Sequence, residues 1–520
     1  MILGALAFST ALCAQNKIDF EEYDLNNGLH VILHEDHSTP IAAVTVLYHV
    51  GSKNEDPERT GFAHFFEHLL FEGSENIGRG EFDSYVTNAG GALNANTSQD
   101  RTFYFELLPS NQMELGLWLE SERMLHANIQ NIGVETQREV VKEEKRQRVD
   151  NQPYGSWLEN MMKRLYTEHP YNWVPIGSMD HLNAAQLDEF MNFYKKFYVP
   201  NNATLSIAGD IDIEKTKALI QAYFGEIPRG ADVVQPTVKE PALGGEQTAT
   251  IYDNIQLPAI MMGYRMPPQT SDDAYALQMA SSVLSGGPSS RMYKRLVDQD
   301  QTALQVFAFP FSLEQGGAFI TFSLANAGKT IDDMVPALEE EISNLQNDLI
   351  SEREFQKIQN QMESNFIQSN SKMAGIAESL ADYHTYYGDA NYINTEIERY
   401  RSVTREDIQR VAKKYLVKDN RVVLRYLPKS EEPAINSIQE NEAPDLKLEV
   451  TENEVIEVTI KESEIPQAVR GPLAKDADKY IEALKKRFPN ATGAELQSKG
   501  YISESYVNRF QNITSEEPAE

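Results

Sequence analysis

Alternating apolar and polar positions predict the first strands of this 520-residue chain. The stretches LHVILHE (29–35) and IAAVTVLYHV (41–50) follow the two-residue period of a β-strand, with turn sequences before and between them. Apolar positions then recur with a helical period over 111–125 and 133–149. Strands and helices mix without a strict βαβ rhythm, which predicts an α+β fold with mixed sheets.

One pattern occurs twice. KKFYVPNNATLSI (195–207) and KKYLVKDNRVVLR (413–425) each read as the end of a helix, a polar turn and a strand, and they lie 218 residues apart. Convergence on a common connection is the simpler alternative. The spacing favours a duplication, with two homologous α/β sandwich domains in tandem.

Changes in composition suggest where these domains end. Residues 228–247 are rich in Pro and Gly and read as a linker between domains at 17–227 and 248–430. Residues 431–465 hold eleven acidic and two basic side chains, which is typical of a flexible connector, although 446–460 could add a pair of strands. Two further helices, near 474–487 and 504–511, complete the predicted extension at 431–520.

The first sixteen residues carry no charge and hold an apolar run from Ile2 to Leu12. The run resembles a signal peptide with Ala14 as the last residue removed, although the usual basic start is missing; a short buried segment is the alternative. It is too short to span a membrane. Cys13 is the only cysteine, so a mature chain would have no thiol, which suits an oxidising compartment. We therefore expect a periplasmic or secreted protein.

The net charge of −31 argues against a nucleic-acid partner, because phosphate binding requires clustered Lys and Arg. The loss of Cys13 also limits metal chemistry. Any strong metal site in the mature chain must use histidine and carboxylate.

The string HFFEH (64–68) offers such ligands. Residues four apart share one face of a helix, so His64 and His68 can present two imidazoles to one ion. Glu67 lies at the edge of that face, where it could take a proton from a metal-activated water. The simpler alternative is two ordinary histidines on a polar face. A catalytic zinc ion needs a third ligand.

Candidates for that ligand lie in ETQREVVKEEKRQRVD (135–150). Glu144 follows Val141 and Val140 at helical spacing, so we expect it beside an apolar stripe that faces the interior. Glu143 is less favourably placed. The other charged residues of this helix are more typical of a solvated face.

With these segments in view, residues 18–430 resemble the pitrilysin, insulin-degrading enzyme and mitochondrial processing peptidase family of zinc peptidases. GFAHFFEHLLFEGS (61–74) is similar to the metal helix of the family, which has the H-x-x-E-H order. Glu144 lies 76 residues beyond His68, about where the family places its third ligand. The resemblance implies one zinc ion held by His64, His68 and Glu144, with Glu67 as general base.

NAGGALNANTSQDRTFYF (88–105) is similar to the strand on which these enzymes lay the substrate. An exposed edge strand can bind an extended peptide through backbone hydrogen bonds. The resemblance places Asn94 and Ala95 in contact with the substrate. Taken alone, the stretch would read as a Gly turn and an ordinary strand.

The sequence also departs from the family. Gln137 stands where the family has a second acidic residue, and no H-x-x-E-H occurs in the second half, which should be metal-free. Val297 and Leu304 occupy the positions where single-chain relatives often present an arginine and a tyrosine to the substrate. Arg291 and Tyr293 lie close by and could replace them.

Family members build their chamber from two bilobal halves of about this length, so this chain should supply one half of a clamshell. We therefore expect a homodimer, or a heterodimer with a metal-free homologous subunit. The function implied is a zinc metalloendopeptidase that hydrolyses peptides or unfolded segments in an enclosed chamber. The alternative is a non-catalytic scaffold or peptide-binding subunit of the same family.

Overall fold

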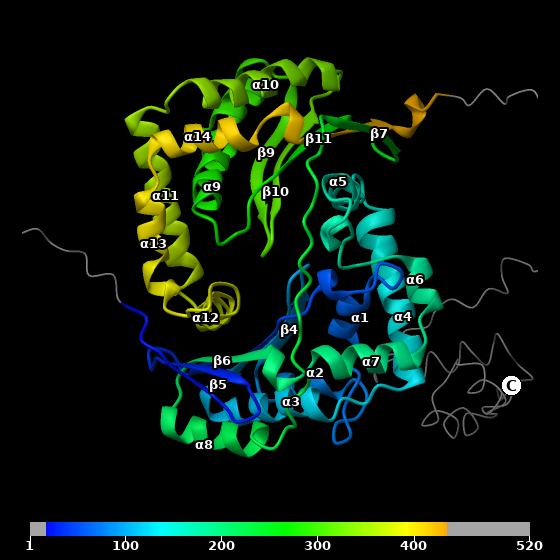
Figure 1. Ribbon diagram of the computed structural model, residues 1–520, viewed down its shortest axis with the longest axis vertical. Coiled ribbons are helices and arrows are strands. Elements are labelled where there is room, and N and C mark those ends of the chain that lie inside the picture. Colours follow the sequence, from blue (N-terminus) through cyan, green and yellow to red (C-terminus); the bar gives the residue numbers. More distant parts are fainter. Residues whose placement is uncertain (1–16, 434–520) are drawn as a thin grey trace, which may run out of the picture. The chain divides into compact units, whose positions relative to one another are not determined.

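The computed structural model describes residues 17–433, which form two mixed sheets covered by helices (Figure 1). The predicted cleavage after Ala14, the strand pair at 446–460 and the two helices beyond it lie outside the described residues. No helix within 17–433 is long and apolar enough to cross a bilayer.

The first sheet has six strands in the order β1-β2-β6-β3-β5-β4. Their bounds are β1 (Glu21–Asp24), β2 (His30–Glu35), β3 (Ile41–Tyr48), β4 (Ala92–Thr97), β5 (Thr102–Pro109) and β6 (Ala203–Gly209). The strands β2 and β6 run parallel, and the other neighbours are antiparallel. The strand β4 therefore lies at an edge of the sheet.

The second sheet has five strands in the order β7-β11-β8-β10-β9. Their bounds are β7 (Gln247–Asp253), β8 (Ala259–Arg265), β9 (Ala303–Ser312), β10 (Gly317–Ala325) and β11 (Arg421–Pro428). This order repeats β2-β6-β3-β5-β4, and again only the first pair runs parallel. The predicted α+β fold with a duplicated mixed sheet is confirmed.

Fourteen α-helices lie in the described residues. Those of the first half are α1 (Phe62–Leu69), α2 (Glu81–Asn88), α3 (Met113–Leu125), α4 (Asn131–Lys145), α5 (Trp157–Leu165), α6 (Met179–Ala184), α7 (Leu187–Phe197) and α8 (Ile213–Phe224). Those of the second half are α9 (Asp272–Ser285), α10 (Ile331–Asn347), α11 (Glu352–Ser369), α12 (Met373–Tyr387), α13 (Tyr392–Ser402) and α14 (Arg405–Tyr415).

The repeated sequence pattern lies at the same place in both halves. Residues 195–207 end α7, form a 3₁₀ turn and enter β6, and residues 413–425 connect α14 to β11 in the same way. Both strands are central in their sheets, between one parallel and one antiparallel neighbour. The pattern therefore marks equivalent connections of the duplicated unit.

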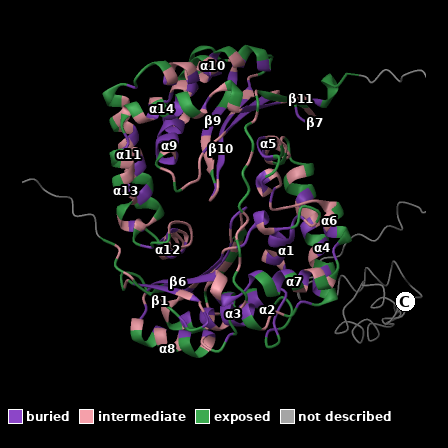
Figure 2. Ribbon diagram, in the orientation of Figure 1, coloured by how far each residue is buried: buried purple, intermediate pink, exposed green. Residues whose placement is uncertain are grey.

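Helices from its own half cover one face of each sheet. The helices α1, α3, α7 and α8 pack on the first sheet, and α9, α10 and α14 pack on the second. Most side chains of the central strands are buried in these layers, whereas the outer sides of the helices are exposed (Figure 2).

The opposite face of each sheet is covered by a helix from the other half. On the first sheet, Ile32, Ala43 and Ala208 pack against α12. On the second, Ala259 and Met261 pack against α5. Each half thus buries part of its apolar surface only with the help of the other.

Glycine allows the close approach of α5 to β8. A Cβ atom built on Gly263 would lie 2.3 Å from Sδ of Met161, so a larger residue here would require the Met161 side chain to move. Gly263 thus leaves space on β8 for a side chain of α5.

Candidate metal centre

The helix α1 carries HFFEH and is fixed by an apolar face. Phe62, Phe65 and Phe66 are buried and pack against Phe190 and Phe193 of α7. The opposite face is left to the polar residues of the string. The packing of this apolar face fixes the orientation of α1, so that both histidines lie on the opposite face of the helix.

The start of α1 is capped by Glu55. Gly61 precedes the helix with φ of 99°, a conformation that favours glycine. The Glu55 carboxylate accepts hydrogen bonds from the backbone N–H groups of Gly61 and Ala63, at 2.9 and 2.8 Å. Burial nevertheless raises the pKa of Glu55 to about 8, against the effect of these bonds. This cap sets where the metal helix begins.

The three residues predicted as ligands, His64, His68 and Glu144, lie close together. Oε2 of Glu144 is 3.5 Å from Nε2 of His64 and 3.1 Å from Nε2 of His68. The two imidazole rings are steeply inclined, with centroids 4.9 Å apart and an interplanar angle of 78°. Three ligand atoms on two helices, α1 and α4, therefore face one point.

These atoms fit a zinc ion. Ligands at about 2.1 Å in a tetrahedral site lie roughly 3.4 Å from one another, close to the two measured separations. Oε2 of Glu144 is buried and has no hydrogen-bond partner within 17–433, so a cation would satisfy it. Two histidines, one glutamate and an open position form a donor set of catalytic zinc sites.

The electrostatic environment keeps His64 and Glu144 in the protonation states that can bind a metal ion. Burial, together with His68, lowers the pKa of His64 to about 4, so its imidazole is neutral near pH 7. Burial alone would raise the pKa of Glu144, but the approach of His68 and His64 outweighs it and lowers the pKa. Both groups are thus in the protonation state that metal binding requires.

Of the two neighbouring glutamates on α4, Glu144 lies beside the histidines and Glu143 does not. Glu143 bonds instead to Arg146 and Gln147, one turn further on. The predicted apolar stripe is narrower than expected, because Val141 is fully buried but Val140 is 43% exposed. The prediction for Val140 was wrong, since α4 is covered on one side only.

Glu67 lies beside the three ligand atoms and is held by Thr97. The Thr97 hydroxyl, at the end of β4, donates a 2.6 Å hydrogen bond to Oε2 of Glu67. Burial raises the pKa of Glu67, and this hydrogen bond opposes the rise. Oε1 is left for a substrate or a water molecule.

Sequence reasoning missed Thr97 and Arg148. Thr97 follows Asn94 and Ala95 on the same strand, so its contact with α1 depends on how β4 crosses the helix. Arg148 lies one turn beyond Glu144 and pairs with its Oε1 at 2.5 Å, which leaves Oε2 for the histidines. A basic residue at i+4 was the only sign of this pair in the sequence.

The edge strand β4 contains both predicted substrate contacts. Asn94 and Ala95 pair with Phe105 and Tyr104 of β5 on one side only. The Ala95 N–H donates to Oδ1 of Asn94, its own neighbour, at 2.9 Å. This donor is therefore directed away from the sheet ladder, as an added strand would require.

Gln137 stands where the family has a second acidic residue. Its side-chain amide donates a 2.6 Å hydrogen bond to the carboxylate of Glu72. A carboxylate is thus present near this position, but it comes from another segment and also pairs with Arg79. Nδ1 of His64 and Oε1 of Gln137 are both buried without a hydrogen-bond partner among the described residues. No acidic group therefore orients His64 through Nδ1.

The region around 283–306 offers no free arginine. Arg291 makes two hydrogen bonds with Glu354, at 3.0 and 2.9 Å. Tyr293 and Val297 pack against the second core, and Leu304 lies 49% exposed on the edge strand β9. Arg291 would have to leave Glu354 in order to contact a substrate.

The fold and the site define a class: a duplicated α+β protein in which two histidines and one glutamate form a candidate metal centre. Residues 30–173 match the model described as Insulinase (Peptidase family M16), and residues 184–362 match Peptidase M16 inactive domain. The chain belongs to peptidase family M16, and the resemblance seen in the sequence is confirmed.

Known relatives are named as zinc proteases. Zinc protease PqqE of Helicobacter pylori is 31% identical over 399 residues, which are 76% of this chain and 90% of that protein. The uncharacterized zinc protease ML0855 of Mycobacterium leprae is 26% identical over 400 residues, which are 76% of this chain and 88% of that protein.

Solved structures share the fold. The crystal structure of a protease from Helicobacter pylori matches with a TM-score of 0.76 and 30% identity, and the match covers 79% of this chain and all of that one. The periplasmic protease PqqL from Escherichia coli has a TM-score of 0.64 at 18% identity. That match covers 84% of this chain but 52% of PqqL. The chain thus corresponds in fold to about half of PqqL.

Proposed function

We propose that the protein is a zinc-dependent metalloendopeptidase that hydrolyses peptides or unfolded polypeptide segments. The observation that carries the proposal is the meeting of His64, His68 and Glu144 at one point, with the carboxylate of Glu67 beside them. The names of the relatives, zinc proteases, support the same chemistry.

In the proposed mechanism, His64, His68 and Glu144 hold one zinc ion per chain. When bound, zinc supplies an activated water and polarises the peptide carbonyl. Glu67 then accepts a proton from the water at Oε1, because Oε2 is engaged by Thr97, and delivers it to the leaving amine. Its raised pKa suits a group that must both take and release a proton.

The proposed substrate lies along β4 as an added antiparallel strand. Its backbone carbonyl would replace Oδ1 of Asn94 as the acceptor for the Ala95 N–H. Main-chain recognition places little demand on side chains, so it suits extended peptides of varied sequence. The proposed catalytic domain is residues 17–227, and the domain at 248–430 has no H-x-x-E-H and so no catalytic zinc centre of its own.

We propose that the active assembly contains a second subunit, either another copy or a metal-free homologue. Two observations support this: the chain matches half of PqqL in fold, and Arg291 is held by Glu354. A partner would supply the arginine and tyrosine missing at Val297 and Leu304. The periplasm or cell exterior is the proposed location, supported by the cysteine-free sequence after residue 13.

The test compares zinc content and cleavage of a fluorogenic peptide library for wild type, Glu67→Gln and Glu143→Gln. Glu67→Gln should retain zinc and lose activity by roughly 100-fold or more, because its amide cannot accept the proton. Glu143→Gln is the matched control and should behave as wild type. Equal activity in wild type and Glu67→Gln would reject the assignment. A zinc-loaded wild type that cleaves nothing, when purified with its native partners, would favour the non-catalytic scaffold.

A further inference from the structure

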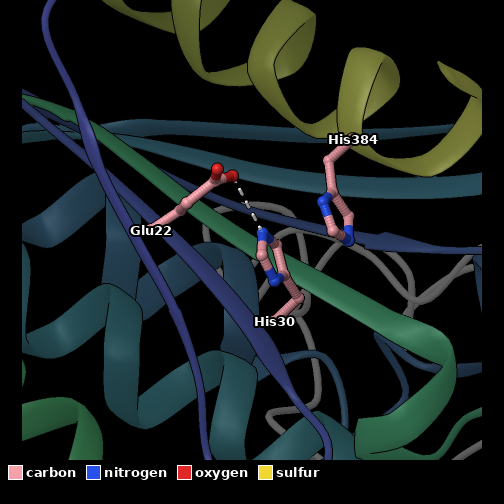
Figure 3. A group of neighbouring side chains, drawn as sticks. All are labelled: Glu22, His30 and His384. Atoms are coloured by element: carbon pink, nitrogen blue, oxygen red, sulfur yellow. Dashed lines mark ion pairs between the residues drawn. The ribbon is translucent and has the colours of Figure 1, made fainter. Parts of the chain in front are cut away.

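A second group of possible metal ligands lies where α12 meets the first sheet (Figure 3). Glu22 comes from β1, His30 from β2 and His384 from α12. One ligand atom from each lies within 4.8 Å of the others. This group shares no residue with the His64, His68 and Glu144 centre.

Asp24 contacts one ring nitrogen of His30. Nδ1 of His30 lies 2.8 Å from Oδ1 of Asp24, so the Nδ1–H donates to that carboxylate. A carboxylate that holds one ring nitrogen in this way is the usual outer partner of a metal-binding histidine. The lone pair of Nε2 is then directed away from Asp24, toward Glu22.

Nε2 of His30 is a buried atom without a hydrogen-bond partner in the described part of the chain. It lies 3.4 Å from Oε2 of Glu22. Either a metal ion or a proton on Nε2 would relieve the repulsion between two electron-rich atoms at this separation, and roughly 3.4 Å is the distance between two ligands of one tetrahedral ion. A second proton on His30 could satisfy this pair but would make no use of His384.

His384 brings a second imidazole to the pair. Its ring stacks on that of His30, with centroids 3.4 Å apart and an interplanar angle of 6°. A metal ion binds imidazole in the plane of the ring, so His384 must turn to share an ion with His30. A cavity of about 240 Å³ adjoins both histidines.

We propose that Glu22, His30 and His384 form a second binding site for a divalent transition-metal ion. Two imidazoles and one carboxylate favour Zn²⁺, Ni²⁺ or Cu²⁺ over Mg²⁺ or Ca²⁺. His384 belongs to the second half and the other two ligands to the first. The ion therefore links α12 to the first sheet. The role is structural and does not depend on peptidase activity.

The experiment counts metal in the full chain after chelation and reloading with Zn²⁺. Wild type should bind two equivalents, and His384→Ala should bind one. The variant His64→Ala/His68→Ala, in which the first centre is removed, should retain one equivalent and lose it when His384→Ala is added. In this background, Co²⁺ should give visible absorption bands that also depend on His384.

His37→Ala is the matched control, because His37 also contacts two carboxylates, Glu35 and Asp210, but belongs to no group of three close ligand atoms in the described residues. It should leave both equivalents in place. Thermal melts in chelator show whether each variant is folded, and Zn²⁺ should raise the melting temperature of His64→Ala/His68→Ala but not of the triple variant. Metal binding by His64→Ala/His68→Ala of less than one equivalent, or an equivalent in that variant that persists when His384→Ala is added, would overturn the proposal.

Discussion

The Thr97 hydroxyl donates a 2.6 Å hydrogen bond to Oε2 of Glu67, and so ties the end of the edge strand to the carboxylate beside the metal centre. The same strand carries Asn94 and Ala95. In the proposed mechanism, a substrate that docks on β4 is therefore held by the same strand that orients the proposed general base.

Replacing Thr97 by Val should lower kcat about tenfold, because Glu67 loses the bond that fixes its rotamer. KM and zinc content should change little, since Thr97 is a positioning residue. Thr97→Ser keeps the hydroxyl and should restore most of the rate. Steady-state kinetics on one fluorogenic peptide measure both parameters. Equal kcat in wild type and Thr97→Val would show that Glu67 is oriented by other contacts.

Glu144→Gln should reduce zinc affinity by more than roughly 100-fold, because a ligand is lost and not merely an outer partner. Glu143→Gln, one residue earlier, should retain wild-type affinity, since Glu143 bonds to Arg146 on the outside of α4. Competition with a fluorescent chelator measures both constants. Similar affinities for the two variants would contradict the ligand set.

Ala95→Pro removes the N–H that faces away from the sheet. Proline is tolerated at the open side of an edge strand, so the fold and the bound zinc should persist. The loss of one backbone hydrogen bond should reduce kcat/KM about tenfold. Unchanged kinetics in a folded, zinc-loaded Ala95→Pro would show that substrate does not pair with β4 at this position.

Arg123 is a buried cation beneath the metal helix. It pairs with Glu120, lies 3.5 Å from Glu106 and contacts the ring of Tyr104. Arg123→Met leaves two buried carboxylates without their partner and should lower the free energy of unfolding by about 3–5 kcal/mol. Arg146→Met, on the surface, should change it by less than about 0.5 kcal/mol. Urea titrations compare the two, and equal midpoints would show that Arg123 does not stabilise the fold.

Glu314 lies in the turn between β9 and β10, and its carboxyl group makes the free energy of unfolding depend on pH. Burial would raise the pKa of Glu314, but His49 and Lys53 of the first half outweigh it and lower the pKa to about 2. A carboxyl whose pKa falls on folding stabilises the protein above its unfolded pKa of 4.5, and this contribution is lost as the pH falls toward 2.

Glu314→Gln should therefore be less stable than wild type at pH 7, and the difference should shrink as the pH falls through 4 to 3. Urea unfolding at several pH values measures this. A constant difference between the two proteins would mean that the pKa of Glu314 is not lowered by folding.

Local patterns in the sequence predicted much of the fold and of the metal centre. The strands β2 and β3 follow from their alternation, and the pairing of His64 with His68 follows from helical spacing. Glu144 was chosen because Val141 at i−3 should be buried, as it is. The error at Val140 arose because spacing alone does not show how wide the covered side of a helix is.

The sequence could not predict contacts that depend on how distant segments pack. Thr97 meets Glu67 from 30 residues away, and its partner is defined by the path of β4 across α1. His30 and His384 meet across the two halves and belong to no motif. Such contacts require the tertiary structure, because neither residue constrains the other through local geometry.

The exchange of α5 and α12 has a consequence for how the chain folds. If the gene were cut within 228–247, each fragment would present a sheet with one bare apolar face, and the helix that covers it would be on the other polypeptide. Separately expressed fragments should aggregate, whereas coexpressed fragments should reassemble. Although the two sheets repeat one strand order, we expect the two halves to unfold together as a single cooperative unit.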